Sequence, residues 1–383
     1  MKDRVAIVGC PAYGAEQVEA AVRRAIDLMG GMTRFVQPGQ RVLVKPNLVQ
    51  ATDPDKAVVT HPSLVRAVVR LVQQADGQVV IADNPVVIPV TRRAWQSAYE
   101  RVGLAAVAAE TGAVLNMQIS AEQRPHPRGK LVKLVDTSSF LTEADVVISL
   151  PKLKTHGLMR YTGAVKNLFG TVPGATKFGY HVKLQGVDQF ADMLLDLASF
   201  VRPALTIMDA VVGMDGDGPS AGEPFPIGAI LAGADPVAVD VAALELVGQE
   251  PAEVPTVSAA MRRGWTTGRA ADLELVGDAL ATRRVSGFRM PLGGPSQMDR
   301  APRFLQNWGT RQLVASPFVT DACVGCGLCV ENCPVETICQ VGGVARIDLS
   351  GCIRCYCCHE MCPEQAIRLR RPWLRRMLAR LGQ

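Results

Sequence analysis

The sequence predicts an α/β domain with a mostly parallel sheet and covering helices, followed by a small α+β domain at the carboxyl end. Two observations carry this prediction. Over residues 1 to 320, short β-rich runs alternate with helical stretches, which is the pattern of a parallel sheet with helices packed on it. All but one of the 11 cysteines then follow within residues 323 to 362, which indicates a separate unit organised by thiols.

The elements expected in the large domain are bounded by Gly, Pro or Asp, the residues that commonly end strands and helices. Strands are expected at residues 4 to 10, 40 to 44, 78 to 82, 113 to 117, 145 to 150, 204 to 209 and 227 to 232. Helices are expected at residues 16 to 29, 61 to 74, 92 to 102, 188 to 200 and 236 to 246. In open α/β sheets ligands bind outside the carboxyl ends of the strands, so the chemistry is expected there.

The cysteine-rich unit contains the spacing C-x2-C-x2-C-x3-C-P twice. This is the bacterial pattern for a pair of 4Fe-4S clusters, in which the fourth cysteine of each copy ligates the other cluster. One predicted ligand set is Cys323, Cys326, Cys329 and Cys362, and the other is Cys352, Cys355, Cys358 and Cys333. Because Val341-Gly-Gly-Val344 between the copies is a hairpin turn signal, the unit is expected to fold as two equivalent halves.

Zinc and disulfide bonds are the alternatives for these cysteines. Zinc ribbons usually take four ligands as two separated pairs, whereas this sequence has runs of three plus one. Disulfides are disfavoured because the amino terminus shows no secretory signal and cytosolic thiols stay reduced. Cys10, Cys339 and Cys357 are left over by the spacing rule, and we interpret them as free buried thiols.

Over roughly the last sixty residues the chain resembles the dicluster bacterial-type ferredoxins, on the two cysteine motifs and the turn between them. The resemblance implies a small two-fold α+β domain, with boundaries expected at residues 316 and 370. Two 4Fe-4S clusters are the cofactors that it implies.

The net charge of the 383-residue chain is +5, and its basicity is local. Without six arginines near the carboxyl end, the rest of the chain would carry −1, which argues against a nucleic-acid-binding surface. The tail at residues 371 to 383 has apolar residues at helical spacing, and it could lie on an acidic membrane, dock on a partner, or pack back on its own domain. No apolar stretch is long enough to span a membrane, so a cytoplasmic location is expected. The six arginines are Arg368, Arg370, Arg371, Arg375, Arg376 and Arg380.

Several predicted strands run into polar segments with distinctive sequences. They are Lys45-Pro-Asn47, Thr60-His-Pro62, Asp83-Asn-Pro85, Pro151-Lys-Leu-Lys-Thr-His156, Lys166-Asn-Leu-Phe-Gly170, Gly213-Met-Asp-Gly-Asp-Gly-Pro219 and Asp235-Pro-Val-Ala-Val-Asp240. Apart from Asp83-Asn-Pro85, this ordered set resembles an uncharacterised family called domain of unknown function 362, over roughly residues 40 to 250. In that family a ferredoxin-like module often follows, as here, but the resemblance implies no settled substrate.

Four lysines are expected to gather positive charge at one rim of the sheet, where they would bind a small anionic substrate. Any one of them could instead be a solvated surface lysine. Asn47 and Asn167, which neighbour two of these lysines, are further candidates for substrate binding. Lys152 and the two histidines are candidates for acid-base catalysis, since the ordinary histidine pKa lies near neutrality. The lysines are Lys45, Lys152, Lys154 and Lys166, and the histidines are His61 and His156.

Asp215 and Asp217 in a glycine-rich loop could contribute to substrate binding or hold a divalent cation, although a tight turn is the stronger interpretation. The calcium-loop template fails, because its twelfth position is Pro226. Neither G-x-x-x-x-G-K-[ST] nor a helix-opening G-x-G-x-x-G is found, which removes the usual support for ATP hydrolysis and dinucleotide binding. A flavin stays open, since flavin sites lack one universal signature.

Taken together, these features predict an α/β domain over residues 1 to 280, a connector over 281 to 315 and an iron-sulfur module over 316 to 370. In the first hypothesis, the clusters feed electrons to an anionic molecule bound at the strand ends. In the second, the protein is a non-enzymatic electron carrier or subunit that docks a redox partner. In the third, the clusters are structural or sensory, and the α/β domain binds a ligand.

Overall fold

A computed structural model describes residues 2–85, 91–118, 120–291 and 314–370 of the chain. The predicted basic tail at 371 to 383 and most of the predicted connector lie outside these residues. Among the described residues, no helix is both long and apolar enough to cross a lipid bilayer.

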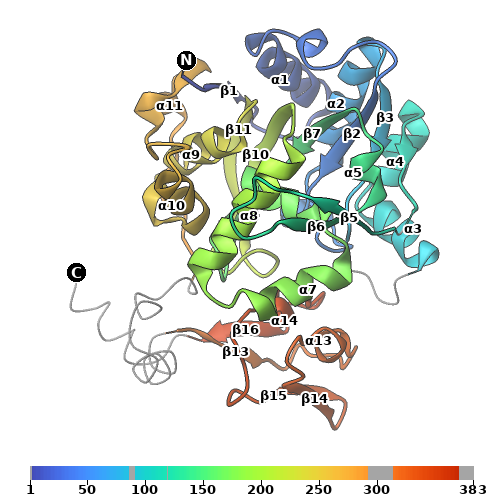
Figure 1. The fold of residues 1–383 in the computed structure, drawn as a ribbon, viewed down its shortest axis with the longest axis vertical. Helices are drawn as coiled ribbons and strands as arrows, with labels where there is room; N and C mark the ends of the chain where they lie inside the picture. The colour runs from blue at the N-terminus through green and yellow to red at the C-terminus, as the bar shows by residue number, and fades with distance from the viewer. Residues whose placement is uncertain (1, 86–90, 119, 292–313, 371–383) are drawn as a thin grey trace.

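A ten-stranded sheet forms the centre of the large domain (Figure 1). Its strands are β1 (Arg4–Gly9), β2 (Arg41–Pro46), β3 (Gln78–Ile81), β4 (Val114–Leu115), β7 (Val146–Leu150), β8 (Lys152–His156), β9 (Arg160–Thr162), β10 (Leu205–Asp215), β11 (Glu223–Gly233) and β12 (Glu274–Gly277). Their order is β12-β1-β11-β10-β7-β2-β3-β4, with β8 beside β10 and β9 beside β8. Among the described strand pairs of this ten-stranded sheet, only β1–β11, β10–β11 and β8–β9 are antiparallel. This confirms the mostly parallel sheet.

Helices cover both faces of this sheet. The side chains of β2 alternate between two apolar cores, one on each face of the sheet. Val42 and Val44 pack under one helical layer, and Leu43 packs under the other. The first layer is formed by α1 (Ala15–Leu28), α2 (Pro62–Gln74), α3 (Arg92–Arg101) and α4 (Leu104–Thr111). The second contains α5 (Ser139–Thr142), α6 (Ala164–Asn167), α8 (Val187–Val201), α9 (Pro236–Leu246) and α10 (Pro255–Arg262). The predicted α/β fold with covering helices is therefore confirmed.

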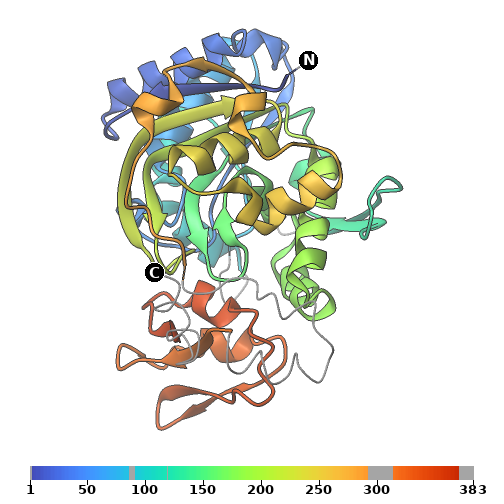
Figure 2. The ribbon, with the colours of Figure 1, turned by 90° about the vertical axis from the view of Figure 1, so that its left-hand side faces the viewer.

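Several parts of the large domain were not predicted, including α4, α10, β12 and the three segments that follow. The antiparallel hairpin of β8 and β9 follows β7 directly, and its polar sequence lacks the apolar alternation of an ordinary strand although β8 is buried throughout. A short ribbon of β5 (Glu122–Pro125) and β6 (Leu134–Thr137) projects from the domain, as Figure 2 shows. Helix α7 (Gly174–Lys183) lies above the small domain in Figure 1.

The small domain has the predicted α+β organisation. Strand β13 (Ser316–Val319) pairs with β16 (Ile367–Arg370), and β14 (Ile338–Val341) pairs with β15 (Val344–Ile347). Two short helices, α13 (Leu328–Glu331) and α14 (Cys357–Met361), lie between them. Gly342 and Gly343 have φ of 61° and 78°, which suits the tight turn predicted there.

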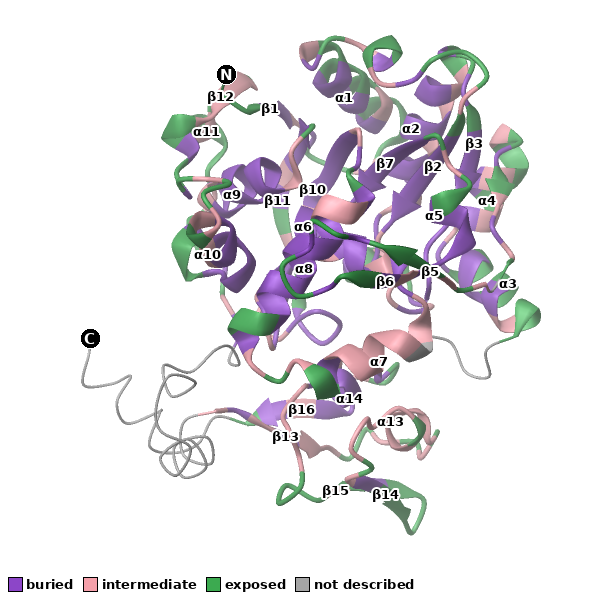
Figure 3. Cartoon of the chain, in the orientation of Figure 1, coloured by how far each residue is buried: buried purple, intermediate pink, exposed green. Residues whose placement is uncertain are grey.

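The loop that follows β10 joins the two domains. The hydroxyl of Ser220 donates to the carbonyl oxygen of Glu360 at 2.9 Å, and the amide of Gln365 donates to the carbonyl oxygen of Ser220 at 2.7 Å. The ring of His359 lies between two carbonyl oxygens, 3.0 Å from that of Asp217 and 2.6 Å from that of Ile367. Figure 3 shows buried residues continuing from the sheet into α14, so the small domain is held against the carboxyl side of β10.

Candidate functional site

The first predicted ligand set surrounds one hollow in the small domain. Cys323, Cys326, Cys329 and Cys362 all line this space of about 420 Å³, together with the glycine-rich loop between the first three. Gly325 has φ of 68°, and a Cβ there would lie 2.0 Å from the carbonyl oxygen of Gly343, so only glycine fits. The sequence spacing therefore brings together the four thiols that it was expected to bring together.

Backbone amides are directed at several of these sulfur atoms. The N–H of Ala345 lies 3.5 Å from the Sγ of Cys323, and that of Ala366 lies 3.2 Å from the Sγ of Cys362. Hydrogen bonds to sulfur stabilise thiolate ligands and tune the potential of iron-sulfur clusters. The hollow, its thiols and these donors fit a 4Fe-4S cluster.

In the second predicted ligand set, the other three cysteines lie close enough to Cys358 to affect its pKa, as does Cys329 of the first set. Burial raises the pKa of Cys358 well above its ordinary value, and the charges of Cys355 and Cys352 nearby act in the same direction. Cys333 adds to this effect and accepts a hydrogen bond from the N–H of Thr337 at 3.3 Å. A bound metal centre would supply the positive charge that such a group of thiolates needs.

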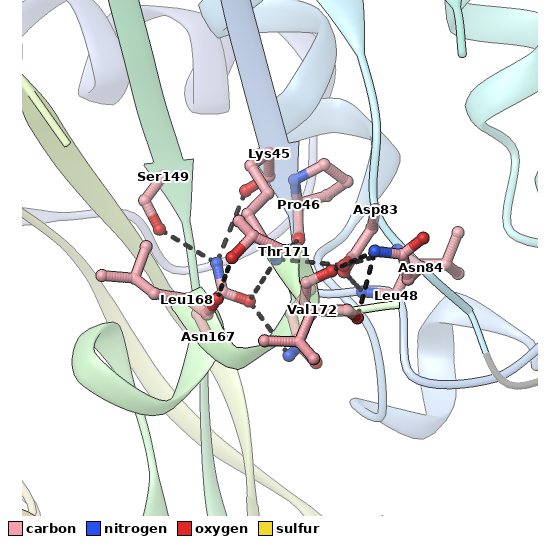
Figure 4. Close-up of polar contacts among 12 residues, drawn as sticks. Lys45, Pro46, Leu48, Asp83, Asn84, Ser149, Asn167, Leu168, Thr171 and Val172 are labelled. Carbon is pink, nitrogen blue, oxygen red and sulfur yellow. Dashed lines mark hydrogen bonds and ion pairs between the residues drawn. The ribbon is translucent and has the colours of Figure 1, made fainter. Parts of the chain in front are cut away.

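A network around Lys45 forms the floor of a pocket between the two domains (Figure 4). The ammonium of Lys45 is fully buried, lies 3.1 Å from Oδ1 of Asp83 and 3.4 Å from Oδ1 of Asn167. Asn167 Oδ1 also accepts from Nδ2 of Asn47 at 3.1 Å. A Cβ on Gly170 would lie 2.2 Å from Asp83 Oδ1, so the glycine of the Lys-Asn-x-x-Gly motif lets the chain pass close to the ion pair.

The pocket above this floor has an empty volume of about 740 Å³, part of which is open to solvent. Lys154, Lys166 and Lys177 supply positive charge from β8, α6 and α7. Of the candidates predicted from the sequence, Asn47, Lys154, Lys166 and Asn167 line it. Its other walls include Asp83, Asn84, Thr162, Phe169, Phe178, His181, Cys357, Glu360 and Met361.

Burial shapes the charge of these lysines. It lowers the pKa of Lys154 to about 7, with a further lowering from Lys166, and it lowers the pKa of Lys177 to about 8. The ammonium of Lys154 donates to the carbonyl oxygen of Val58 at 2.6 Å, and that of Lys177 donates to Asn84 at 2.9 Å. Lys166 makes no hydrogen bond or ion pair within the described part of the chain, although burial also lowers its pKa.

Helix α14 forms both a wall of the pocket and part of the second thiol group. Cys358 belongs to the predicted ligand set, while its neighbours Cys357, Glu360 and Met361 line the pocket. The pocket therefore lies one residue away from a predicted cluster ligand. Cys357 is left over by the spacing rule and Glu360 lies between two motif cysteines, so neither was a sequence candidate for the pocket.

His156 does not line the pocket, but it lies next to Glu360, which does. Its Nε2 lies 2.8 Å from Oε1 of Glu360, although the two atoms are not aligned for a hydrogen bond. Its Nδ1 accepts from the backbone N–H of Leu158 and Met159, which leaves the ring proton on Nε2. Burial lowers the pKa of His156 to about 4, with the Glu360 carboxylate acting against this. His156 is therefore placed to position Glu360 rather than to contact a ligand.

Three sequence candidates lie elsewhere. The ammonium of Lys152 is buried 3.0 Å from Oδ2 of Asp209 and 2.6 Å from the hydroxyl of Tyr13. His61 stacks on the Tyr13 ring at 3.7 Å between centroids, and its Nδ1 caps α2 by accepting from the N–H of Ser63. Asp215 forms a two-point ion pair with Arg289, at 2.8 and 2.7 Å. Since Arg289 already occupies this carboxylate, its geometry does not favour the substrate or cation role proposed for Asp215.

Comparison with known proteins places this chain in a family. Residues 42–245 match the family described as Domain of unknown function (DUF362), and residues 317–339 match the 4Fe-4S binding domain. This chain belongs to the DUF362 family. The second match gives it a 4Fe-4S cluster as a cofactor.

The DUF362 chain is 34% identical over 273 residues to a thylakoid-associated protein of Synechocystis sp., across 69% of this chain and 80% of the relative. Two solved structures also align with it. The lactate racemase apoprotein from Thermoanaerobacterium thermosaccharolyticum has 14% identity and a TM-score of 0.38, covering 62% of this chain and 55% of the racemase. A structural genomics protein from Thermotoga maritima has 11% identity and a TM-score of 0.36, covering 60% and 57%.

Two of the DUF362 motifs do not line the pocket. They instead position the motifs that do. The carboxylate of Asp240, from the Asp-Pro-Val-Ala-Val-Asp motif, accepts from the backbone N–H of Ala164 at 2.6 Å and of Val165 at 3.0 Å. It thereby fixes the start of α6, the helix that carries Lys166. Thr60, from the Thr-His-Pro motif, accepts from the N–H of Asn47 at 2.8 Å and donates to Leu150 at 2.6 Å.

Two buried histidines and one partly buried histidine should make the stability of this DUF362 chain depend on pH. Burial lowers the pKa of His61, His156 and His181 to about 4 each, below the ordinary value of 6.5. Between pH 6.5 and about 4, the unfolded chain binds more protons than the folded chain. The free energy of unfolding should therefore fall as the pH drops through this range. We expect the urea midpoint to be lower at pH 5 than at pH 7.5.

His61→Asn provides the matched variant for this prediction. Asparagine can still accept the N–H of Ser63 as a helix cap, but it does not titrate. The drop in urea midpoint between pH 7.5 and 5 should therefore be smaller in the variant. An equal drop in both proteins would show that His61 does not contribute.

Proposed function

We propose that this protein holds two 4Fe-4S clusters and transfers electrons from them to an anionic small molecule bound between its two domains. The observation that carries the proposal is the dual role of α14. One of its residues, Cys358, belongs to a predicted ligand set, and three others line a pocket with three lysines. A tethered cluster adjacent to a substrate pocket removes the need for a diffusional encounter.

The residues that would hold the clusters are the two sets of four cysteines. The clusters would supply single electrons, which an external reductant, such as a low-potential electron-transfer protein, must replace. Lys166, which has no partner among the described residues, would bind the anion, with Lys154 and Lys177 adding charge. Lys154, with a pKa of about 7, could give a proton to a reduced product near neutral pH.

The test is reoxidation of the reduced protein. Anaerobically prepared protein is reduced with dithionite, excess reductant is removed, and the visible absorbance of the clusters is followed after small organic anions are added. Reoxidation by at least one anion should be slowed by tenfold or more in Lys166→Met, because the lost charge weakens binding next to the cluster.

Lys183→Met is the matched control, since Lys183 is exposed at the end of α7, the helix that carries Lys177, but does not line the pocket. It should leave the rate unchanged. If no anion reoxidises the protein, or if both variants are equally slow, the reductase assignment fails.

A second candidate is an electron carrier that docks a redox partner. It is favoured by exposure at the first ligand set, where Cys326 is exposed and Val324 has 66% of its surface accessible. Such a carrier would exchange electrons with a protein and ignore small anions. We place either activity in the cytoplasm, where thiols stay reduced and can hold iron.

A further inference from the structure

We propose that the pocket between the domains binds a small carboxylic acid that carries its own hydrogen-bond donor, a hydroxyl or an amine, close to the carboxylate. The inference rests on the proposed use of this pocket as a binding site. It adds the chemical class of the ligand.

The carboxylate is matched by the cations. The ammonium groups of Lys154 and Lys177 each donate to a backbone carbonyl oxygen, whereas Lys166 is without such a partner in the described residues. Lys166 also interacts with the other charged groups of the pocket. Its charge lowers the pKa of Lys154 and of Lys177, and the Glu360 carboxylate raises the pKa of Lys166. An ammonium ion in a partly closed pocket binds a carboxylate well.

The donor is matched by polar atoms that have no partner. Asn47 uses its Nδ2 to donate to Asn167, and this leaves its buried Oδ1 without a hydrogen bond among the described residues. Thr162 and His181 are 3% and 6% exposed, and Oγ1 of the first and Nδ1 of the second are likewise unpaired there. All three residues line the pocket. Leaving a buried polar atom unpaired is costly, so a ligand that pairs it gains affinity.

A phosphate fits this arrangement poorly. The dianion of a phosphate monoester, such as methyl phosphate, offers acceptor atoms only, so Asn47 Oδ1 would stay unpaired. The Glu360 carboxylate in the pocket wall would also repel a second negative charge. A carboxylate carries one charge, and an adjacent hydroxyl or amine can donate to Asn47 or to Glu360. Phe169, Phe178 and Met361 provide apolar surface for a short carbon chain.

The test measures equilibrium binding to the oxidised protein by calorimetry, without any electron transfer. The probes are acids of three to five carbons, each unsubstituted, hydroxylated at carbon 2 or aminated at carbon 2, with methyl phosphate as the acceptor-only comparison. At least one hydroxy or amino acid should bind tenfold or more tightly than its unsubstituted parent and more tightly than methyl phosphate. The two substituted series show whether the donor is a hydroxyl or an amine.

Two variants test the assigned contacts. Thr162→Val removes an unpaired hydroxyl without removing any hydrogen bond in the described structure, so it should fold normally. It should reduce affinity for the substituted acid severalfold and leave the unsubstituted acid unaffected. Lys166→Met should weaken both by tenfold or more, and Lys183→Met should weaken neither.

The proposal is overturned if methyl phosphate binds more tightly than every acid, if the substituent brings no gain, or if none of the acids binds. These outcomes are separate from failure of the proposed electron transfer. A protein that binds the acids but is not reoxidised by them would keep this pocket assignment and lose the reductase.

Discussion

Replacing Cys358 with serine is expected to remove about half of the iron and acid-labile sulfide from anaerobically prepared protein. Cys358 is buried in the second predicted ligand set, among Cys352, Cys355 and Cys333. A serine hydroxyl is a weaker ligand for iron than a thiolate, so one of the two proposed clusters should not assemble stably. Because α14 also forms the pocket wall, reoxidation of the reduced variant by any pocket ligand should be lost.

Iron and sulfide are counted chemically, and Cys339→Ser is the control. Cys339 is exposed on β14, so the buried position expected for it was wrong, and it belongs to neither predicted set. Its variant should therefore keep the full content. Wild-type protein that holds zinc, or that lacks inorganic sulfide, would contradict the whole cluster assignment. Full iron content in Cys358→Ser would contradict the assignment of this ligand.

Replacing Lys45 with methionine is expected to lower the free energy of unfolding by about 3–5 kcal/mol, the usual cost of leaving a buried charge unpaired. Lys45 and Asp83 are 0% and 4% exposed and lie 3.1 Å apart. Burial lowers the pKa of Lys45, while Asp83 opposes that change by supporting the charged form. Without the ammonium, the Asp83 carboxylate beside Gly170 would have no cation at ion-pair distance among the described residues.

Urea unfolding monitored at constant pH measures this loss. Arg4→Met is the matched control, because Arg4 and Glu274 also form an ion pair but their side chains are 40% and 43% exposed. Its cost should be much smaller than that of Lys45→Met, because solvent screens an exposed pair. Adding Asp83→Asn to Lys45→Met should recover part of the loss, since asparagine keeps an oxygen for the N–H of Leu48. A loss no larger than that of Arg4→Met would show that the buried pair is unimportant.

Local sequence signals predicted the fold well. The repeated cysteine spacing specified which thiols meet, because ligand spacing within a tight loop depends on a few neighbouring residues. The helix expected at residues 61 to 74 is found as α2, which begins at Pro62 with His61 as its cap. The β8–β9 hairpin was missed because its strand residues are polar and buried, without the alternation that identifies a half-exposed strand.

The site was predicted only in part, because its composition depends on contacts between distant segments. Lys152 and Lys154 lie two residues apart on β8, yet Lys152 meets Asp209 and Tyr13 whereas Lys154 reaches the pocket. Asp215 is paired with Arg289, 74 residues away. Spacing alone cannot show either partner.

The residues missed by sequence reasoning have the same explanation. Glu360 and Cys357 lie inside a ligand motif, where only the cysteine spacing draws attention. Lys177 lies on a helix without a clear apolar period. Cys357 could have been noticed in the sequence, because it lies beside the predicted ligand Cys358 but has no place in the cysteine spacing of the motif.

The shared helix α14 has a thermodynamic consequence. If an anion occupies the pocket, its negative charge disfavours an added electron on a cluster one residue away, so occupancy should shift the midpoint potential downward. Linkage requires the reverse effect to be equal, and reduction should loosen the anion by the same factor. Charging the cluster would thus favour release of a bound acid, and a product that remains anionic would leave most easily while electrons are abundant.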